Sequence, residues 1–560
     1  MKNTFRYKYL LVFAAVFSGF SGAILAQQAG EVKDQEFVIR KDRVLTLPKQ
    51  PRKFERIPVL PTAKVNSSFN YEVRPYFLSL APEIIQPSVA QKQWPRTNEE
   101  LFPGFARLGF GNYASPLIEV RYNNWEEADY NFGASVKHEG YYRGPIDGSN
   151  SGENFTNVKL NGNLFKDFFQ LYGGVDYNRH QFNFYGYDAE NPALQEYIPS
   201  QNILNTFRLK GGIQDIEKMD NFNYDVNLNL RAFNDNYEAS ETEFSIKGFG
   251  DFWFDDYITT GINAELSLTK PKDLWYTDIN RNYFKVNPYV AYQRSGLKVQ
   301  AGANMVVEND VTLNKKSDFH IYPQLYAHYM IQDEFGIYAG FEGDVLRKTY
   351  LDFVTENPFL GPSDQLLNTI QNYLAKAGIK GTINDELTYE AGASYGKFRN
   401  MHFFGNSQAD SLRFNLLYDD DTKVLNYNAK VGWNYEKTYR LIASVDYYYY
   451  TTKTLAAAFQ RPEWVVSINN NFTPTDKWLI QFNANAMGGI KGFVRDALIE
   501  EDMATDLPVI LDLQLKADYQ ITDRFSVFAV GNNLLNRKNQ RFLNYPVRGI
   551  QGIAGLTFKF

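Results

Sequence analysis

The most regular feature of the sequence is an alternation of apolar and polar residues over long segments. In residues 221–232 one face carries Phe222, Tyr224, Val226, Leu228, Leu230 and Ala232, and the other carries Asn221, Asn223, Asp225, Asn227, Asn229 and Arg231. Successive side chains of a β-strand point to opposite faces, so this segment is predicted to be a two-faced strand. Residues 511–521 repeat the pattern, with Leu511, Leu513 and Leu515 on one face and Asp512, Gln514, Lys516 and Asp518 on the other.

These predicted strands are longer than the roughly five or six residues usual in soluble sheets, and they are long enough to cross a bilayer at a tilt. Short turns fall at 166–167, 294–296, 384–386, 436–437 and 522–524, and longer loops at 139–153, 186–202, 270–281, 349–367, 399–421 and 491–507. Transmembrane barrels have short periplasmic turns and long extracellular loops. We therefore predict an all-β fold, a transmembrane antiparallel β-barrel of about 22 strands over residues 104–560. Residues 413–418 fit either a strand or a loop.

Within such a barrel the polar faces line the lumen and the apolar faces contact lipid. The predicted lumen-facing residues are Asn223, Asp225, Asn227, Asn229, Asp512, Gln514, Lys516 and Asp518. The partners expected of this architecture are outer-membrane lipid and lipopolysaccharide, the barrel-assembly machinery during biogenesis, and other envelope proteins.

Two segments precede the predicted barrel. Residues 1–26 have a basic start, a short apolar stretch and small residues up to Ala26, which together predict a cleaved signal peptide. Residues 27–103 hold nine of the 22 prolines, and proline removes backbone donors that a regular sheet requires. This segment carries a net charge of +3 and the barrel region a net charge of −12. We therefore expect an extended, proline-rich periplasmic or lumenal extension that the barrel attracts.

The composition supports a membrane barrel over a large soluble β-protein. Aromatic residues make up 16% of the chain, as expected of girdles at the two membrane interfaces. The mean hydropathy is negative because only alternate residues of each strand would face lipid. Cysteine is absent, in keeping with export to an oxidising periplasm. Since no segment of the sequence beyond the signal peptide approaches the length of a membrane-spanning helix, a closed barrel is the expected way to enter the outer membrane.

The C-terminal end resembles that of known outer-membrane barrels. Gly552, Ala554, Leu556, Phe558 and Phe560 alternate up to a terminal phenylalanine, which is similar to the sorting signal that such barrels show to the assembly machinery. Val530-Gly531-Asn532-Asn533-Leu534-Leu535-Asn536-Arg537-Lys538 and Pro546-Val547-Arg548-Gly549 resemble the last two strands of TonB-dependent receptors. The resemblance implies an outer-membrane barrel for uptake or passage of a solute, with Leu556, Phe558 and Phe560 as the assembly signal.

The segment before the barrel departs from this family. TonB-dependent receptors carry a plug domain and a short TonB-contacting box, whereas residues 27–103 number only 77 and residues 36–39 match the box poorly. The resemblance therefore does not extend to energy-coupled transport. The alternative function is a non-transporting accessory or structural barrel within a larger complex for secretion, surface export or assembly. A barrel of this width would leak if empty, so we expect residues 27–103, or else an inward-folded loop such as 399–421, to fill it.

The titratable residues form no catalytic constellation in the sequence. The five histidines are His138, His180, His320, His328 and His402. His320 and His328 share a strand face but would lie roughly 26 Å apart, too far to act together. Motifs of barrel phospholipases and proteases are absent from the sequence. We therefore expect neither enzymatic activity nor a cofactor.

Two acidic runs, Asp419-Asp420-Asp421 and Glu500-Glu501-Asp502, are weak candidates for a cation site. Calcium prefers several oxygen ligands, but adjacent side chains diverge, so solvated loops are the favoured interpretation and no defined metal site is predicted. The tyrosines at 447–450 favour a membrane-interface girdle over sugar stacking. The acidic mature chain, with a net charge of −9, argues against a nucleic-acid partner.

Overall fold

The computed structural model describes residues 102–124, 129–187, 200–216, 221–276, 279–309, 317–332, 334–407, 410, 412–495 and 502–560. The predicted signal peptide and nearly all of the proline-rich segment lie outside these residues, as does most of the acidic run at 500–502. The first strand begins at Gly104.

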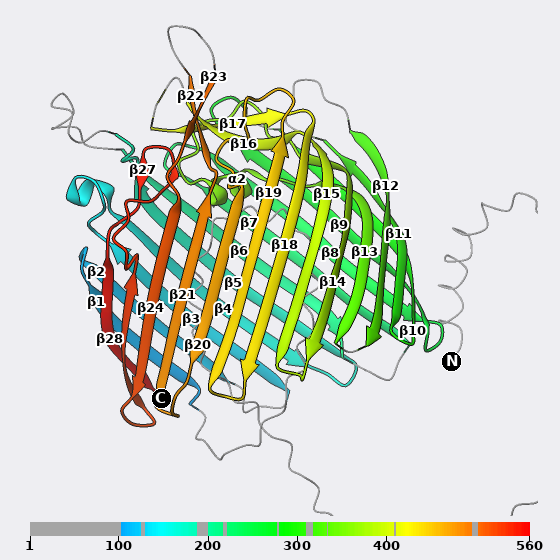
Figure 1. The fold of residues 1–560 in the computed structure, drawn as a ribbon, viewed down its shortest axis with the longest axis horizontal. Coiled ribbons are helices and arrows are strands. Elements are labelled where there is room, and N and C mark those ends of the chain that lie inside the picture. Colours follow the sequence, from blue (N-terminus) through cyan, green and yellow to red (C-terminus); the bar gives the residue numbers. More distant parts are fainter. Residues whose placement is uncertain are drawn as a thin grey trace, which may run out of the picture. The chain divides into compact units, whose positions relative to one another are not determined.

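The described part of the chain forms one closed antiparallel barrel of 22 strands, which confirms the predicted fold class. Neighbouring strands of the barrel follow one another in sequence, and the last strand pairs with the first (Figure 1). At this seam Leu108 lies opposite Leu556, and Gly104 and Phe560 exchange two backbone hydrogen bonds of 3.0 Å. Closure leaves no unpaired strand edge, which is what a lipid environment requires.

The barrel strands range from 8 to 15 residues. Their bounds in the first half are β1 Gly104–Gly111, β2 Ser115–Asn124, β3 Tyr130–Tyr141, β4 Glu153–Phe165, β5 Phe169–Asn183, β6 Gln201–Asp215, β7 Phe222–Asn234, β8 Ser240–Trp253, β9 Ile258–Lys272, β10 Arg281–Arg294 and β11 Leu297–Glu308. Those of the second half are β12 Asp318–Gln332, β13 Phe335–Leu346, β14 Thr369–Ile383, β15 Leu387–Arg399, β18 Thr422–Tyr435, β19 Tyr439–Thr451, β20 Trp464–Phe472, β21 Trp478–Gly488, β24 Ile510–Gln520, β25 Phe525–Asn532 and β28 Gln551–Lys559.

The remaining elements belong to the connections. They are the 3₁₀ helix η1 Gly148–Ser151, the helix α2 Tyr350–Glu356, and three small hairpins: β16 Met401–Asn406 with β17 Phe414–Asp419, β22 Lys491–Arg495 with β23 Asp502–Asp506, and β26 Gln540–Phe542 with β27 Tyr545–Pro546. The ambiguous residues 413–418 thus largely form a strand, but it pairs with β16 inside a loop and stays out of the barrel wall.

The two ends of the barrel differ in their connections. At one end the strands are joined by short turns, such as Ser295-Gly296, where both residues have positive φ (47° and 81°) as a tight hairpin turn between twisted strands requires. At the other end lie α2 and the three loop hairpins (Figure 1). We call this second end the loop end. Its connections include the six long loops predicted from the sequence, together with residues 452–463 and 533–550, which the sequence did not single out as long loops.

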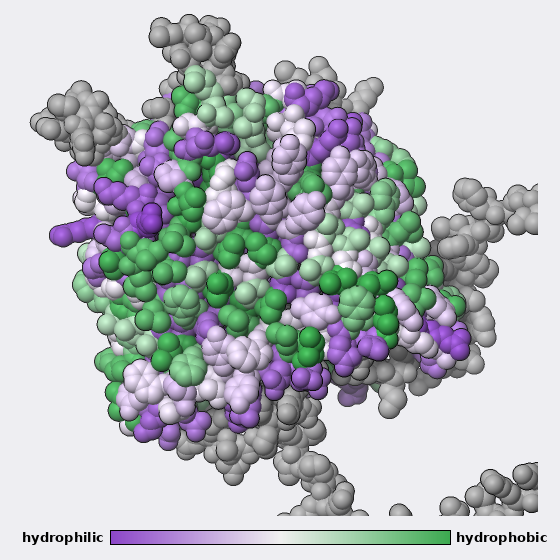
Figure 2. Space-filling model, in the orientation of Figure 1, coloured by the Kyte–Doolittle hydropathy of each residue, from purple (hydrophilic) through white to green (hydrophobic). Residues whose placement is uncertain are grey.

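Large apolar side chains are exposed on the outer surface of the barrel. On β12, Phe319, Ile321 and Leu325 are 64, 57 and 50% exposed, whereas the alternate residues His320, Tyr322 and Gln324 are less exposed. Figure 2 shows hydrophobic residues spread over the middle of the strands, with hydrophilic residues gathered nearer the ends. This distribution matches an apolar band facing lipid. Among the described residues, no helix has the length and apolar character needed to cross a membrane.

Candidate functional site at the loop end of the barrel

The loops of the loop end pack on one another around a shared apolar core. We call these packed loops together the cap. Its buried members include Phe184 from the β5–β6 loop, Phe353 from α2, Phe404 and Phe414 from the β16–β17 hairpin, and Tyr545 from the last loop. Phe359 stacks on Tyr545 with ring centroids 3.6 Å apart. Because these residues come from loops far apart in sequence, the alternating pattern that predicted the strands could not reveal the cap.

The helix α2 is fixed to the barrel wall through its N-terminus. The Glu241 carboxylate on β8 accepts hydrogen bonds from the backbone N–H groups of Tyr350 (2.8 Å) and Leu351 (3.4 Å). Arg231 on β7 pairs with the same carboxylate at 2.8 Å and donates to Thr349 Oγ1 at 3.2 Å. A carboxylate is well placed at a helix N-terminus, where free N–H groups and the helix dipole favour negative charge.

A buried ionic cluster ties three cap segments together, and we call it the cap cluster. Arg461, which is 1% exposed, donates to Glu356 Oε1 at 2.6 Å and to the backbone oxygen of His402 at 2.8 Å. His402 Nε2 lies 2.9 Å from Glu356 Oε2. The three residues come from α2, from β16 and from the β19–β20 loop, so the cluster joins three separate connections of the barrel.

The protonation states within the cap cluster follow from burial and charge. Burial alone would raise the pKa of Glu356, but Arg461 and His402 outweigh this effect and hold the pKa well below its usual range. For His402 burial is the largest influence, and it lowers the pKa to about 4 although Glu356 acts in the opposite direction. At neutral pH the cluster therefore consists of a carboxylate, a guanidinium and a neutral imidazole.

The segment that resembles TonB-dependent receptors organises the last loop. The Asn533 side chain donates to the backbone oxygens of Arg537 (2.8 Å) and Arg548 (2.7 Å) and accepts from Arg537 N–H at 3.1 Å. Asn533 and Asn536 both have positive φ, which asparagine tolerates better than most residues. The asparagines of the motif thus have a structural role, because they fold residues 533–550 back over the loop end.

Arg548 of this loop is anchored to the barrel wall. It donates to Glu153 Oε2 at 2.9 Å and stacks over the Tyr141 ring at 4.1 Å. The other oxygen of Glu153 lies 2.8 Å from His180 Nε2. His180 and His402 therefore each contact a carboxylate. The first contact joins the consecutive strands β4 and β5, and the second joins β16 to α2.

The predicted lumen-facing residues of β7 are less exposed than the valine and the two leucines that alternate with them. Asn223, Asp225, Asn227 and Asn229 are half-buried, whereas Val226, Leu228 and Leu230 are 39, 47 and 47% exposed. Asp225 accepts a hydrogen bond from Tyr172 at 2.7 Å, and Asn229 donates to Ser245 at 3.3 Å. The contact with Tyr172 of β5, across β6, and that with Ser245 of the neighbouring strand β8 support the proposed assignment of the polar face to the lumen.

The predicted residues of β24 show the same behaviour. Gln514 and Lys516 are each 5% exposed, whereas Leu515 between them is 43% exposed. Asp518 joins Lys516 (3.1 Å) to Arg107 of β1 (3.3 Å). Gln514 bridges β21 and β25 through Asn483 and Asn532, and Asp512 accepts from the Asn533 backbone at 3.1 Å. A hydrogen-bonded polar belt therefore runs across this part of the wall.

The predicted assembly signal lies at the barrel seam. Leu556, Phe558 and Phe560 are 61, 37 and 41% exposed, and Phe558 packs on Phe525 with ring centroids 4.8 Å apart. The three side chains alternate along β28 and its end, so they share one face. Their role in assembly stays a prediction.

The weak cation candidates have protein partners instead of a common centre. Asp419 is buried and accepts hydrogen bonds from the backbone N–H and the hydroxyl of Thr454 (both 2.7 Å), and from the Thr422 hydroxyl (2.7 Å). Burial would raise its pKa, but these donors lower it to about 2. Asp421 pairs with Lys397 at 3.0 Å, and Asp420 is exposed. Asp419 thus serves to fix the β19–β20 loop.

The barrel is similar to several solved outer-membrane receptors. The FrpB iron transporter of Neisseria meningitidis superposes with a TM-score of 0.65 at 11% identity, covering 83% of this chain and 82% of that chain. The pyoverdine outer membrane receptor FpvA of Pseudomonas aeruginosa PAO1 gives 0.61 at 14%, covering 84% and 80%. The siderophore receptor PirA of Acinetobacter baumannii gives 0.61 at 9%, covering 84% and 81%.

At these identities the similarity establishes the fold alone, a large β-barrel, and the neighbours are receptors and transporters of the outer membrane. No protein-family model matches the sequence, and no curated protein matches it.

Proposed function

We propose that the chain is an outer-membrane barrel for uptake of a solute, with the cap acting as its outer gate. The proposal rests on one combination of features. The 22-strand wall is closed and is polar on its less exposed face, and a cap built from several loops lies at one end. A barrel of this strand number is wide enough to hold a ligand or a plug. The alternation of polar and apolar residues gives a wetted inner path inside a lipid-facing shell.

The class of solute to test first is an iron chelate. The fold neighbours are an iron transporter, a pyoverdine receptor and a siderophore receptor. We further propose that residues 27–103 act in place of a conventional plug domain and that a signal peptide in residues 1–26 directs export. These two proposals rest on the sequence alone.

Uptake is tested in a strain that lacks the gene and is complemented with the wild-type chain. We expect accumulation of a radiolabelled iron chelate to fall in the deletion strain under iron limitation and to return with the plasmid. Accumulation that is unchanged for a panel of hydroxamate, catecholate and mixed chelates would exclude iron as the cargo.

Gating by the cap is tested with an engineered disulfide. Because the sequence contains no cysteine, the two introduced cysteines have no other thiol in the chain to pair with. A Cβ placed at Gly361 would lie 3.2 Å from Cβ of Arg413, slightly closer than the roughly 3.5–4.5 Å of a disulfide, so a small shift suffices. The Gly361→Cys/Arg413→Cys variant would tie the β13–β14 loop to the β15–β18 loop. We expect uptake to stop in the oxidised cells and to recover after reduction. The reduced state of the same protein is the matched control.

The second candidate function is a non-transporting accessory barrel, and the buried cap cluster is the observation that favours it. A permanently closed end would suit a scaffold for other envelope proteins. Gentle detergent extraction followed by mass spectrometry separates the two cases. A stoichiometric protein partner together with normal uptake in the deletion strain would support the accessory function.

A further inference from the structure

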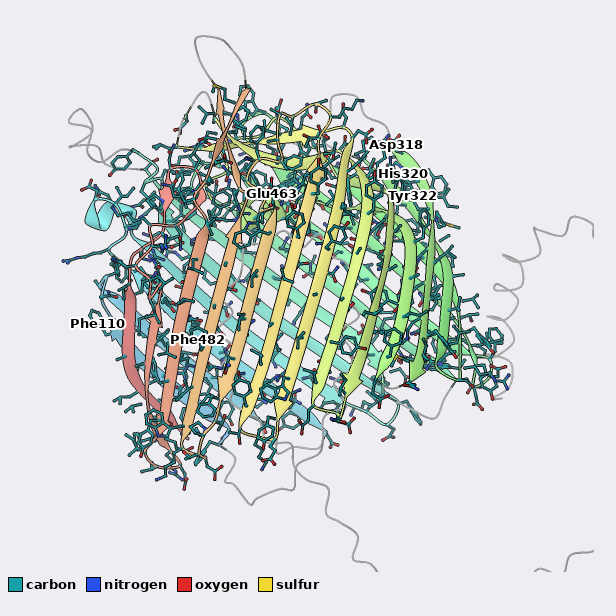
Figure 3. All side chains as sticks on the ribbon, in the orientation of Figure 1. Phe110, Asp318, His320, Tyr322, Glu463 and Phe482 are labelled. Atoms are coloured by element: carbon teal, nitrogen blue, oxygen red, sulfur yellow. The ribbon has the colours of Figure 1, made fainter. Side chains whose placement is uncertain are left out.

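Three possible metal ligands meet at the loop end of the neighbouring strands β11 and β12. Glu308 ends β11, Asp318 begins β12 opposite it, and His320 follows two residues later on the same face. One ligand atom from each residue lies within 4.8 Å of the other two. Figure 3 shows Asp318 and His320 at the loop end of β12, followed along the strand by Tyr322.

The spacing of the imidazole and the carboxylate fits a shared ion. His320 Nε2 lies 3.4 Å from Glu308 Oε1, which is longer than a good hydrogen bond of about 2.7–3.2 Å. Two ligands each about 2.1 Å from a tetrahedral metal ion are separated by about 3.4 Å. The observed distance therefore matches an edge of a tetrahedral site better than a direct hydrogen bond.

Surrounding contacts hold two of the ligands in place. The Glu308 side chain is fully buried, and its second oxygen accepts from Asn368 Nδ2 at 2.9 Å. Asn368 is in turn held by Arg281 at 2.8 Å and by the Lys348 backbone at 3.0 Å. The His320 ring lies nearly parallel to that of Tyr322, with an interplanar angle of 10° and a centroid distance of 6.1 Å. Such outer contacts orient ligands and tune metal affinity.

We propose that Glu308, Asp318 and His320 form a binding site for a divalent first-row transition-metal ion. Two carboxylates and one imidazole suit Zn²⁺, Mn²⁺, Fe²⁺ or Co²⁺. Three protein ligands leave a fourth position for water or an external ligand. The ion would clip the ends of β11 and β12 together beside the cap. This inference does not depend on the transport proposal.

The test uses the full-length protein purified in detergent with a tag that contains no histidine. Zn²⁺ binding is measured by equilibrium dialysis and elemental analysis, and Co²⁺ binding by the visible bands of tetrahedral cobalt. We expect one tightly bound equivalent in the wild type. His320→Gln and Asp318→Asn should each weaken binding at least about tenfold, and Asn368→Ala about 10- to 100-fold.

His328→Gln is the matched control, because His328 lies on the same strand and the same face, eight residues from His320. Heat-modifiability on gels confirms that each variant is folded, and Asp318→Asn replaces the most exposed of the three ligands if His320→Gln fails to fold. Binding that is equal in the wild type, His320→Gln and Asp318→Asn would overturn the proposal. So would a wild type that binds no Zn²⁺, which would leave His320 and Glu308 as a directly interacting pair.

Discussion

Removing Arg461 should open the cap without unfolding the barrel. Arg461 is the central cation of the cap cluster, and the Arg461→Met variant would leave Glu356 buried with only His402 as a hydrogen-bond partner among the described residues. Breaking a buried ion pair by removing one partner costs about 3–5 kcal/mol. At about 1.4 kcal/mol per factor of ten, this would raise the population of open caps roughly 10²- to 10⁴-fold. Protonation of Glu356 relieves part of the cost, so we expect the lower end of this range.

Hydrogen exchange of backbone amides in the cap measures this opening directly. The Asn357 amide donates to Phe353 O at 2.9 Å within α2, and the Phe414 amide donates to Phe359 O at 3.0 Å between two loops. Both amides should exchange roughly a hundredfold faster in Arg461→Met, while barrel-strand amides keep their wild-type rates. A double variant, Glu356→Met/Arg461→Met, replaces the pair by apolar side chains and should recover much of the protection.

Two results would contradict this reasoning. Unchanged exchange at Asn357 and Phe414 would mean that the apolar core alone holds the cap closed. Equal acceleration in the single and double variants would show that Arg461 acts through packing and not through its charge.

Four further perturbations test the cap, the barrel wall, the C-terminus and the proline-rich segment. Because the folded-state pKa of His402 is lowered, its contribution to cap closure is complete above its unfolded pKa of about 6.5 and is lost as the pH falls toward about 4. Hydrogen exchange of the cap amides should therefore accelerate as the pH falls through that range, and His402→Gln should remove this part of the pH dependence. Leu513→Arg should impair assembly by roughly 2–4 kcal/mol near the membrane midplane while Gln514→Arg is tolerated; equal tolerance would refute the face assignment. Deleting Phe560 should lower the amount of heat-modifiable barrel in the membrane, and unchanged levels would count against an assembly signal. Deleting residues 27–92 should raise single-channel conductance if the segment occupies the lumen.

The barrel was predictable because its signal is local. Alternation over a strand such as β7 needs only neighbouring residues. Counting such segments gave about 22 strands, in agreement with the 22 observed, and the regular change between short and long connections was consistent with that count. The pattern becomes less regular near the loop end. Phe233 lies on the polar face of β7 beside Arg231 but is buried in the cap core. A large apolar residue at such a position has no local explanation, because its partners come from other loops.

The cap cluster and the proposed metal-binding site were not predicted from the sequence, for a different reason. Glu356 and Arg461 are 105 residues apart, and neither lies in a motif that would join them. Glu308 and His320 are only 12 residues apart. The sequence analysis compared the histidines only with one another, so it could not reveal that His320 lies beside a carboxylate. Pairing Glu308 with Asp318 across the hairpin would have done so, because residues opposite each other on antiparallel strands have neighbouring side chains.

The cap also sharpens the test of the proline-rich extension. The sequence offered residues 27–103 or a loop such as 399–421 as the filling of the barrel, and the hairpin β16–β17 of that loop now proves to be part of the cap. If the extension also enters the lumen, the two obstructions act in series, and removing one leaves most of the resistance in place. We therefore expect deletion of residues 27–92 to raise conductance only slightly in the wild type and strongly in the Arg461→Met background, where the cap opens. A deletion without effect in both backgrounds would place the extension outside the lumen, and a large effect in the wild type would mean that the closed cap already conducts.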